Sequence, residues 1–241
     1  MGSIPITRSK IRLSQIAELV YAGGMSRNSM NAVENSAEMW NGIWEKIPSQ
    51  FSGSKTLEAW YRRIVYFSAF DTLLNLLPPS NQILELGSGT GRNSAYLAKR
   101  YSAQSVTLLD FSESALGRTR EEDFSCALIK IQQDLLRFTP QKQYGFVHST
   151  GLIEHFTGQE RRAVVQKHAE CVAPGGYVMI WVPVQSPAFF VIGQFNKLMG
   201  IEEVPLTETE LKTLLMEARL KIIGENHAVF GALYGVLAQK V

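Results

Sequence analysis

A glycine-rich turn after an apolar strand carries the clearest chemistry in this sequence. Three glycines stand at every second position, Gly87, Gly89 and Gly91, and Glu85 precedes the first by two residues. Glycine lets the backbone turn sharply and come close to a ligand. A helix predicted over 92–101 begins directly after the turn, and the free N–H groups at its start favour a polar or anionic partner. The turn therefore predicts a nucleotide-like ligand.

The glycine spacing separates two classes of nucleotide-binding protein. Dinucleotide-binding folds favour Gly-x-Gly-x-x-Gly, whereas here the third glycine comes one residue early and Arg92 stands in its usual place. The run over 85–91 resembles the first motif of class I S-adenosylmethionine-dependent methyltransferases, written E-x-G-x-G-x-G. The resemblance implies an enzyme of the small-molecule type with S-adenosyl-L-methionine as its cofactor. The cofactor residues of the turn are then Glu85, Gly87, Ser88, Gly89 and Gly91.

A second acid ends the next predicted strand. A carboxylate at the position of Asp110 can accept two hydrogen bonds from the vicinal hydroxyls of a ribose. In the family that the sequence resembles, this acid does so and the next residue lies against the adenine, a contact that suits Phe111. Asp110 could instead only cap the helix that begins near Ser114. Its register with the glycine turn favours ribose binding.

A third acid follows the third predicted strand. The family often places an acid there that receives the adenine amino group, so the resemblance implies this role for Asp134, beside Leu135. A solvated loop carboxylate is the alternative. Glu85 could accept N–H groups of the glycine turn or contact the amino group of the cofactor through water.

The end of the fourth predicted strand resembles the fourth motif of small-molecule methyltransferases. In that family the strand end and the following turn line the methionine part of the cofactor, so we expect Ser149, Thr150 and Gly151 to face it. His148 lies inside the apolar strand and is interpreted as a core histidine. His155 is the candidate general base because an imidazole titrates near neutral pH; packing at a helix start is the alternative.

The pair Glu154-His155 also belongs, in some relatives, to a metal site written E-x-x-E-H. Gly151 stands where the first glutamate of that site would be. One carboxylate and one imidazole are few ligands for a divalent ion. The sequence therefore predicts no metal, and the pair could orient the N-terminal helices or act on substrate.

Alternating strands and helices must position these residues. Strands are predicted over 82–86, 105–110, 127–132, 144–149 and 176–182, with helices over 92–101, 112–120 and 159–172. This alternation predicts an α/β, Rossmann-like, doubly wound and mostly parallel sheet. A capping box at Thr207 predicts a helix over 208–218. The apolar runs 220–224 and 229–238 could pair as a C-terminal antiparallel hairpin, which would complete the seven-stranded sheet that the family resemblance implies.

Two segments outside this alternation are expected to face the substrate. Residues 1–80 are predicted to form an N-terminal helical cap, with helices over 10–22, 31–47 and 57–77, ahead of a cofactor-binding domain over 81–241. Most aromatic residues of these helices are expected to pack on the core. The apolar insert 185–205 could form a lid over a hydrophobic molecule, touch a membrane surface or a second subunit, or pack against the N-terminal aromatics.

The composition of the chain limits the kinds of partner that the protein is expected to bind. The chain has 24 basic and 22 acidic side chains, so its net charge of +2 gives no strong nucleic-acid signal. No stretch is a convincing transmembrane span, although peripheral membrane contact stays open. The two cysteines, Cys126 and Cys171, are interpreted as reduced. We expect a cytoplasmic protein, and the sequence leaves its oligomeric state open.

The expected activity is methyl transfer to a small, partly hydrophobic molecule by in-line displacement. S-adenosylmethionine carries its own activated methyl group, so the enzyme mainly aligns a nucleophile and excludes water. The end of the fourth predicted strand lacks the motif Asn/Asp-Pro-Pro-Tyr/Phe. Many enzymes that methylate exocyclic amino nitrogens of bases, or protein amides, carry that motif. A nucleic-acid or protein methyltransferase, a non-catalytic cofactor-binding partner protein and a nicotinamide (NAD)-dependent oxidoreductase are the alternatives.

Overall fold

A computed structural model of the chain describes residues 35–46, 67–198 and 201–241. They belong to one unit, Val33–Val241. The helix predicted over 10–22, and the first part of that predicted over 57–77, lie outside the described residues. Within the described N-terminal part, the predicted helices appear as α2 (Ala37–Lys46) and α4 (Phe67–Leu74).

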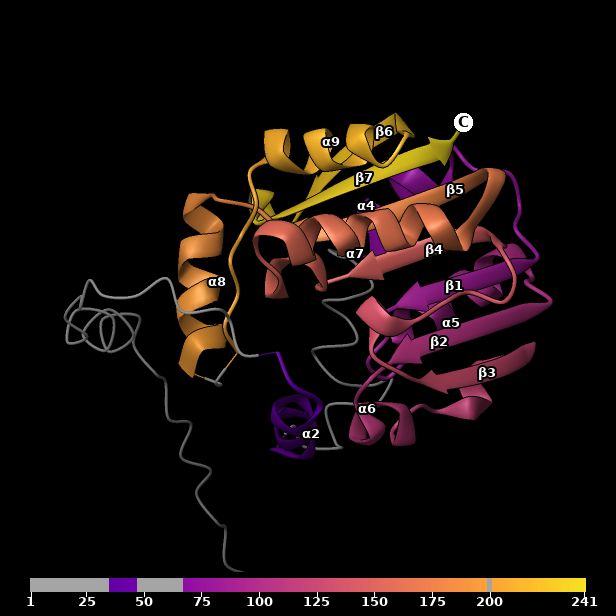
Figure 1. The fold of residues 1–241 in the computed structure, drawn as a ribbon, viewed down its shortest axis with the longest axis horizontal. Coiled ribbons are helices and arrows are strands. Elements are labelled where there is room, and N and C mark those ends of the chain that lie inside the picture. The colour runs from indigo at the N-terminus through magenta and orange to yellow at the C-terminus, as the bar shows by residue number, and fades with distance from the viewer. Residues whose placement is uncertain (1–34, 47–66, 199–200) are drawn as a thin grey trace, which may run out of the picture. The chain divides into compact units, whose positions relative to one another are not determined.

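Seven strands form one sheet in the order β3-β2-β1-β4-β5-β7-β6 (Figure 1). They are β1 (Gln82–Leu86), β2 (Ser105–Asp110), β3 (Ala127–Gln132), β4 (Tyr144–Thr150), β5 (Val172–Pro183), β6 (Leu220–Ala228) and β7 (Leu233–Lys240). The first five strands pair in parallel, and β7 runs antiparallel to both β5 and β6. The predicted mostly parallel sheet with a terminal antiparallel hairpin is confirmed.

Helices bury both faces of this sheet. On one face α4, α5 (Arg92–Tyr101) and α6 (Glu113–Gly117) contribute to a core that includes Phe70, Leu97 and Trp181. On the other face α7 (Gly158–Cys171) and α9 (Glu208–Glu217) contribute to a second core. Because the central strands are covered on both sides, they are continuous apolar runs rather than alternating ones.

The strand register brings the two predicted cofactor segments together. Leu86 at the end of β1 pairs with Leu109 in β2. The residues that follow, Gly87 and Asp110, therefore leave the sheet side by side, at the edge where the parallel strands end. In open α/β sheets, ligands bind at this edge.

Three strand boundaries differ from the prediction by four residues. β6 extends to Ala228 instead of ending at residue 224. β5 begins at Val172, directly after α7, instead of at residue 176. β7 begins at Leu233 instead of residue 229, because Val229–Gly231 forms a short 3-10 turn, η6, with Phe230 at φ 55°. A left-handed residue cannot continue an extended strand.

The apolar insert contains a helix that the sequence did not predict. α8 (Pro187–Leu198) begins with proline, which is favoured at the first position of a helix. In Figure 1 it lies on the side of the sheet toward which the arrowheads of β1 and β2 point. Its role as a lid stays a prediction. None of the helices in the described ranges is long and apolar enough to cross a membrane.

Candidate cofactor site and active site

The glycine turn has the backbone geometry that its sequence predicts. Gly87, Gly89 and Gly91 have φ values of 62°, 53° and 73°, a left-handed region that side chains with a Cβ rarely adopt. Space is also limited, because a Cβ on Gly91 would lie 2.5 Å from a methyl of Leu108. The turn is tied to the neighbouring strand, since the Ser88 N–H donates to the carbonyl of Leu109 over 3.1 Å.

The turn leads directly into α5. Gly91 is the N-cap of this helix and supplies no side-chain cap to its first N–H groups. Donors at such a helix start are suited to an anionic or polar ligand. The structure thus combines the close backbone approach and the donor set that the motif predicts.

Asp110 holds the glycine turn from β2. Its Oδ2 accepts a hydrogen bond from the Gly89 N–H, and its Oδ1 accepts one from the Ser112 N–H, each over 2.8 Å. Burial raises the pKa of Asp110, and these hydrogen bonds oppose the rise. A carboxylate has about four acceptor positions, so two stay available for ribose hydroxyls. Asp110 is not the cap of α6: Ser112 is, since its Oγ accepts from the Ala115 N–H.

The two residues predicted near the adenine have different surroundings. Phe111 follows Asp110 and is half-buried. Asp134 caps the short 3-10 helix η4 (Leu135–Arg137) by accepting from the Leu136 N–H over 2.9 Å, and its other oxygen lies 3.5 Å from Arg137 Nε. Leu135 is buried in the core. Contact of Phe111, Asp134 and Leu135 with adenine stays a prediction.

Glu85 belongs to a buried polar cluster beneath the turn. Asn93 donates to its Oε1 over 3.5 Å, and Oε2 has no hydrogen-bond partner within the described part of the chain. His148 Nδ1 lies 3.8 Å from Oε1, and His148 Nε2 is bonded to Ser94 Oγ. Burial raises the pKa of Glu85 to about 8 and lowers the pKa of His148 to about 3. Both groups are therefore neutral near pH 7, and His148 is the core histidine that the sequence predicts.

Ser149 and Thr150, the two predicted cofactor residues at the end of β4, have different surroundings. Ser149 is fully buried and its Oγ is bonded to His168 Nε2 over 2.8 Å, while His168 Nδ1 is bonded to the Val164 carbonyl. A contact between Ser149 and the cofactor would thus come from its backbone. Thr150 Oγ1 is buried and has no partner among the described residues. Its hydroxyl is the one that a ligand could satisfy.

Helix α2 packs against α6 beside this edge of the sheet. Asn41 Oδ1 accepts from Ser112 Oγ over 2.7 Å and from the Ser114 N–H over 3.2 Å, which ties α2 to α6. The indole of Trp44 lies over the glycine turn, since a Cβ on Gly89 would meet its Cζ2 at 2.8 Å. The predicted role of the N-terminal segment as a cap stays a prediction, but these contacts place one of its helices beside the predicted cofactor residues.

The candidate base lies in the short 3-10 helix η5 (Ile153–His155). His155 is buried, its Nδ1 is 3.0 Å from the Glu202 carbonyl, and its ring packs edge-on against Trp40 at 4.8 Å. Burial lowers the pKa of His155 to about 4, although the carbonyls of Glu202 and Gly151 oppose the change. The imidazole is neutral near pH 7 but a weaker base than an exposed histidine. Burial also raises the pKa of the neighbouring Glu154 to about 8.

Three contributors to this region were missed from the sequence. Asn41 and Trp44 lie in a helix whose aromatics were expected mainly to pack on the core, and Glu203 lies in the insert, beside Glu154 and His155. A polar Asn between two Trp residues of one helix was a weak available signal. Nothing in the sequence pattern marks Glu203, because its place depends on how the insert returns to the sheet.

Comparison with known proteins gives a family match and a fold match. Residues 83–176 match the model of a methyltransferase domain family. No curated protein matches the sequence. A solved structure of a putative methyltransferase in complex with a Haloferax volcanii methyltransferase activator has a TM-score of 0.67 and 11% identity, covering 86% of this chain and 99% of that one.

Two further solved structures contain S-adenosylhomocysteine, the demethylated cofactor. The magnesium protoporphyrin IX methyltransferase of Synechocystis PCC 6803 has a TM-score of 0.60 and 16% identity, covering 85% of this chain and 93% of that one. The 1,6-didemethyltoxoflavin-N1-methyltransferase of Burkholderia thailandensis has a TM-score of 0.59 and 15% identity, covering 88% and 93%. At these identities the likeness establishes the fold.

The family match covers β1 to the first part of β5, which includes the glycine turn, Asp110 and Asp134. The strand order with its terminal antiparallel pair agrees with that match. The family match and the fold agree with the predicted cofactor, S-adenosyl-L-methionine. Residues 83–176 therefore match a methyltransferase domain, and the chain has the fold of solved methyltransferases.

Proposed function

We propose that this methyltransferase acts on a small, partly apolar molecule bound over the carboxyl ends of the parallel strands. The observation that carries the proposal is a pair of exposed aromatic side chains near this edge. Phe190 on α8 is 60% exposed and Phe230 in η6 is 93% exposed. Large apolar side chains left in water beside a ligand site favour an apolar partner.

Topology supports this location. Pro183 at the end of β5 pairs with Leu233 at the start of β7, so η6, which precedes β7, lies at the edge where the parallel strands end. α8 follows β5 and contacts η6. The left-handed backbone of Phe230 is costly for a bulky residue, and such strain is commonly kept at functional sites.

Other properties disfavour a polyanionic substrate. The chain carries a net charge of +2, which supplies no strong field for nucleic acid. The names of two structural neighbours describe methyl transfer to magnesium protoporphyrin IX and to 1,6-didemethyltoxoflavin, both of them small ring molecules. These likenesses support the class of acceptor and not its identity.

The proposed chemistry requires positioning more than a reactive side chain. S-adenosyl-L-methionine supplies a methyl group on a positively charged sulfur, and the acceptor takes it as the carbon–sulfur bond breaks. The glycine turn and Asp110 would hold the cofactor, and Thr150 would line the methionine part of the cofactor. Trp40, Trp44 and α8 would exclude water from the reacting atoms, which favours in-line transfer.

Labelled methyl transfer tests the proposal. The purified chain is incubated with S-adenosyl-L-methionine carrying a labelled methyl group and with separate small-molecule, RNA and protein fractions of a cell extract. We expect label in apolar small molecules. Label in RNA or protein would contradict the proposal, and cofactor binding without transfer to any fraction would favour a non-catalytic cofactor-binding protein.

Variants locate the acceptor surface. Phe190→Ser and Phe230→Ser should each raise KM for the acceptor about 10-fold, because burying an aromatic side chain on a ligand contributes about 1.5 kcal/mol or more. Met216→Ser is the matched control: Met216 is 68% exposed near the end of α9, away from this edge. Equal KM values for all three variants would contradict the placement.

A further inference from the structure

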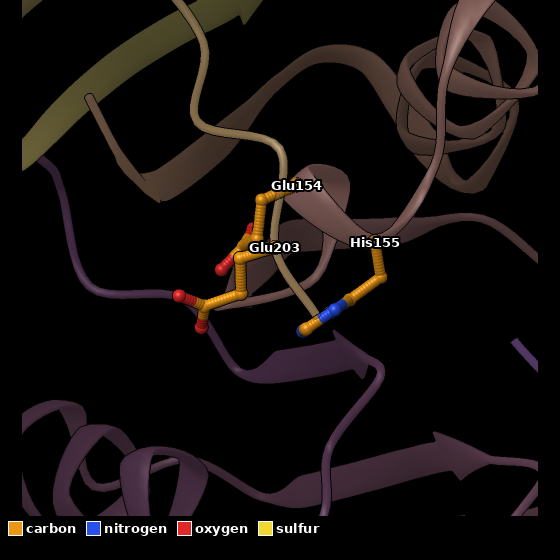
Figure 2. A group of neighbouring side chains, drawn as sticks. All are labelled: Glu154, His155 and Glu203. Atoms are coloured by element: carbon orange, nitrogen blue, oxygen red, sulfur yellow. The ribbon is translucent and has the colours of Figure 1, made fainter. Parts of the chain in front are cut away.

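Two segments far apart in the sequence bring three possible metal ligands together. Glu154 and His155 lie in η5, directly after β4, and Glu203 lies in the segment between α8 and α9. One ligand atom from each of the three residues lies within 4.8 Å of the others (Figure 2). The sequence predicts no metal because it offers only the adjacent pair, and Glu203 joins them only in the fold.

Glu154 is the first sign that the cluster is built for a ligand. Its side chain belongs to a residue that is only 1% exposed, and its Oε2 has no hydrogen-bond partner among the described residues. Figure 2 shows this carboxylate beside that of Glu203. A buried carboxylate oxygen without a partner is costly, and such a group calls for an explanation. A cation between the two carboxylates would satisfy it.

His155 is held in the orientation that metal-binding histidines use. Its Nδ1 lies 3.0 Å from the carbonyl of Glu202, and a carbonyl can only accept. Nδ1 therefore carries the proton in the neutral ring and Nε2 carries the lone pair, although the Gly151 carbonyl also lies close to this imidazole. Metal ligands of this type usually donate their other ring N–H to a backbone carbonyl or carboxylate, which fixes the ring.

Hydrogen bonds hold the two segments against each other. The Val204 N–H donates to the Glu154 carbonyl over 2.9 Å. The buried Arg161 donates to the carbonyls of Phe156 and Val204, each over 2.7 Å, so it joins the residues next to the ligands on both segments. Arg161 also pairs with Glu210 at 2.7 Å. The framework fixes Glu203 beside Glu154 before any ion arrives.

We propose that Glu154, His155 and Glu203 form a binding site for a divalent transition-type cation, Zn²⁺ or Mn²⁺, at the carboxyl end of β4. Carboxylate oxygens suit Mn²⁺ and imidazole nitrogen suits Zn²⁺, whereas Mg²⁺ prefers oxygen ligands alone. Ligand atoms about 2 Å from an ion lie up to about 4 Å apart. Small side-chain movements therefore complete the site.

The test is cation binding to the whole chain after treatment with a chelator. Isothermal titration with Zn²⁺, and the loss of the free Mn²⁺ signal in electron paramagnetic resonance, should each show one site with a micromolar Kd. Mg²⁺ should bind at least 10-fold more weakly. No site tighter than millimolar for either Zn²⁺ or Mn²⁺ would overturn the proposal.

Matched variants assign the site. Glu203→Gln should weaken binding at least 10-fold, because it removes one anionic ligand from a half-buried position. Glu202→Gln removes the same charge from the exposed neighbouring residue, and it should bind as the wild-type chain does. Thermal unfolding in chelator establishes that both variants fold. Equal affinity of Glu203→Gln and Glu202→Gln would overturn the assignment, as would weakening of both.

Discussion

At the scale of single residues, Asp110 holds the glycine turn and is predicted to bind the cofactor. One substitution tests its carboxylate without changing how the side chain packs. Its carboxylate accepts N–H groups of Gly89 and Ser112, and it is predicted to accept the ribose hydroxyls as well. Asp110→Asn keeps the shape but loses the charge and one acceptor. Hydrogen bonds to charged groups contribute about 1.5–3 kcal/mol. We therefore expect the Kd for S-adenosyl-L-methionine, measured calorimetrically, to rise about 10- to 100-fold.

The control for this substitution is Asp123→Asn. Asp123 lies in an exposed 3-10 turn between α6 and β3, so its substitution should leave the Kd unchanged. An unchanged Kd in folded Asp110→Asn protein would contradict ribose binding by Asp110.

The buried Glu85 makes stability depend on pH. Burial raises its pKa from 4.5 to about 8 in the folded chain. Between these two values the unfolded chain is ionised while the folded chain keeps the proton, so the free energy of unfolding falls as pH rises. The slope is at most about 1.4 kcal/mol per pH unit for one proton. Urea unfolding of the cofactor-free chain between pH 7 and pH 8 should show this loss. Below about pH 6.5 the buried His148, His155 and His168, whose pKa values burial lowers, change stability in the opposite direction.

Glu85→Gln should remove about half of that slope, since a neutral amide has no proton to lose while Glu154, whose pKa burial also raises to about 8, keeps its contribution. The exposed Glu113, at the start of α6, supplies the control: Glu113→Gln should keep the wild-type slope. If Glu85→Gln kept the full slope, the loss would belong to another buried group.

At the scale of elements, the glycine turn has a geometry that permits few substitutions. Gly91→Ala would force a Cβ into φ 73° and to 2.5 Å from Leu108, which is fully buried. Left-handed backbone costs about 1–2 kcal/mol and overpacking about 1–3 kcal/mol. The free energy of unfolding should fall by about 2–5 kcal/mol, measured from the urea midpoint.

Gly117→Ala is the matched control for this element. Gly117 lies in α6 and a Cβ there would meet no atom within 4 Å. Alanine in a helix gains up to about 1 kcal/mol over glycine, so this variant should be neutral or more stable. A Gly91→Ala chain as stable as Gly117→Ala would contradict the proposed rigidity of the turn.

The same elements show what the sequence could and could not predict. Strands β1 to β4 and helix α5 follow continuous apolar or helical patterns between glycines and polar turns, so their ranges were predicted almost to the residue. Helix α8 was missed because its run of apolar residues has no strong helical period. The residues of η6 were assigned to the last strand because Val229 and Phe230 are typical strand residues, although their left-handed φ values end it.

The sequence also did not show how residues far apart in the chain come together in the site. The glycine turn and Asp110 could be paired from the sequence because both follow neighbouring parallel strands. Ser149 could not be placed, since its hydroxyl turns to His168 on α7. Asn41 and Glu203 reach the site by packing of segments that no local periodicity links to it.

At the scale of the whole molecule, the two cores meet in a single sheet whose edge carries the predicted cofactor residues. Apolar side chains from α4 and α5 on one face, and from α7 and α9 on the other, fix β1, β2 and β4. The turn and Asp110 are therefore held in place by the sheet, and we expect the cofactor to bind without rearrangement of the strands. A ligand that binds only the folded chain raises its stability by mass action.

Thermal unfolding measures this coupling and separates the two cofactor classes. At a concentration 100-fold above its Kd, a ligand adds about 2.7 kcal/mol, which for a chain of this size raises Tm by roughly 5–10 °C. S-adenosyl-L-methionine and S-adenosylhomocysteine should both produce this rise, and NAD should produce none, because the glycine spacing and Asp134 do not fit a dinucleotide. The Asp110→Asn chain should show a much smaller rise at the same concentration. If NAD raised Tm as much as S-adenosylhomocysteine does, the adenosine part that both ligands share would be sufficient for binding. The early third glycine would then not select the methyl donor.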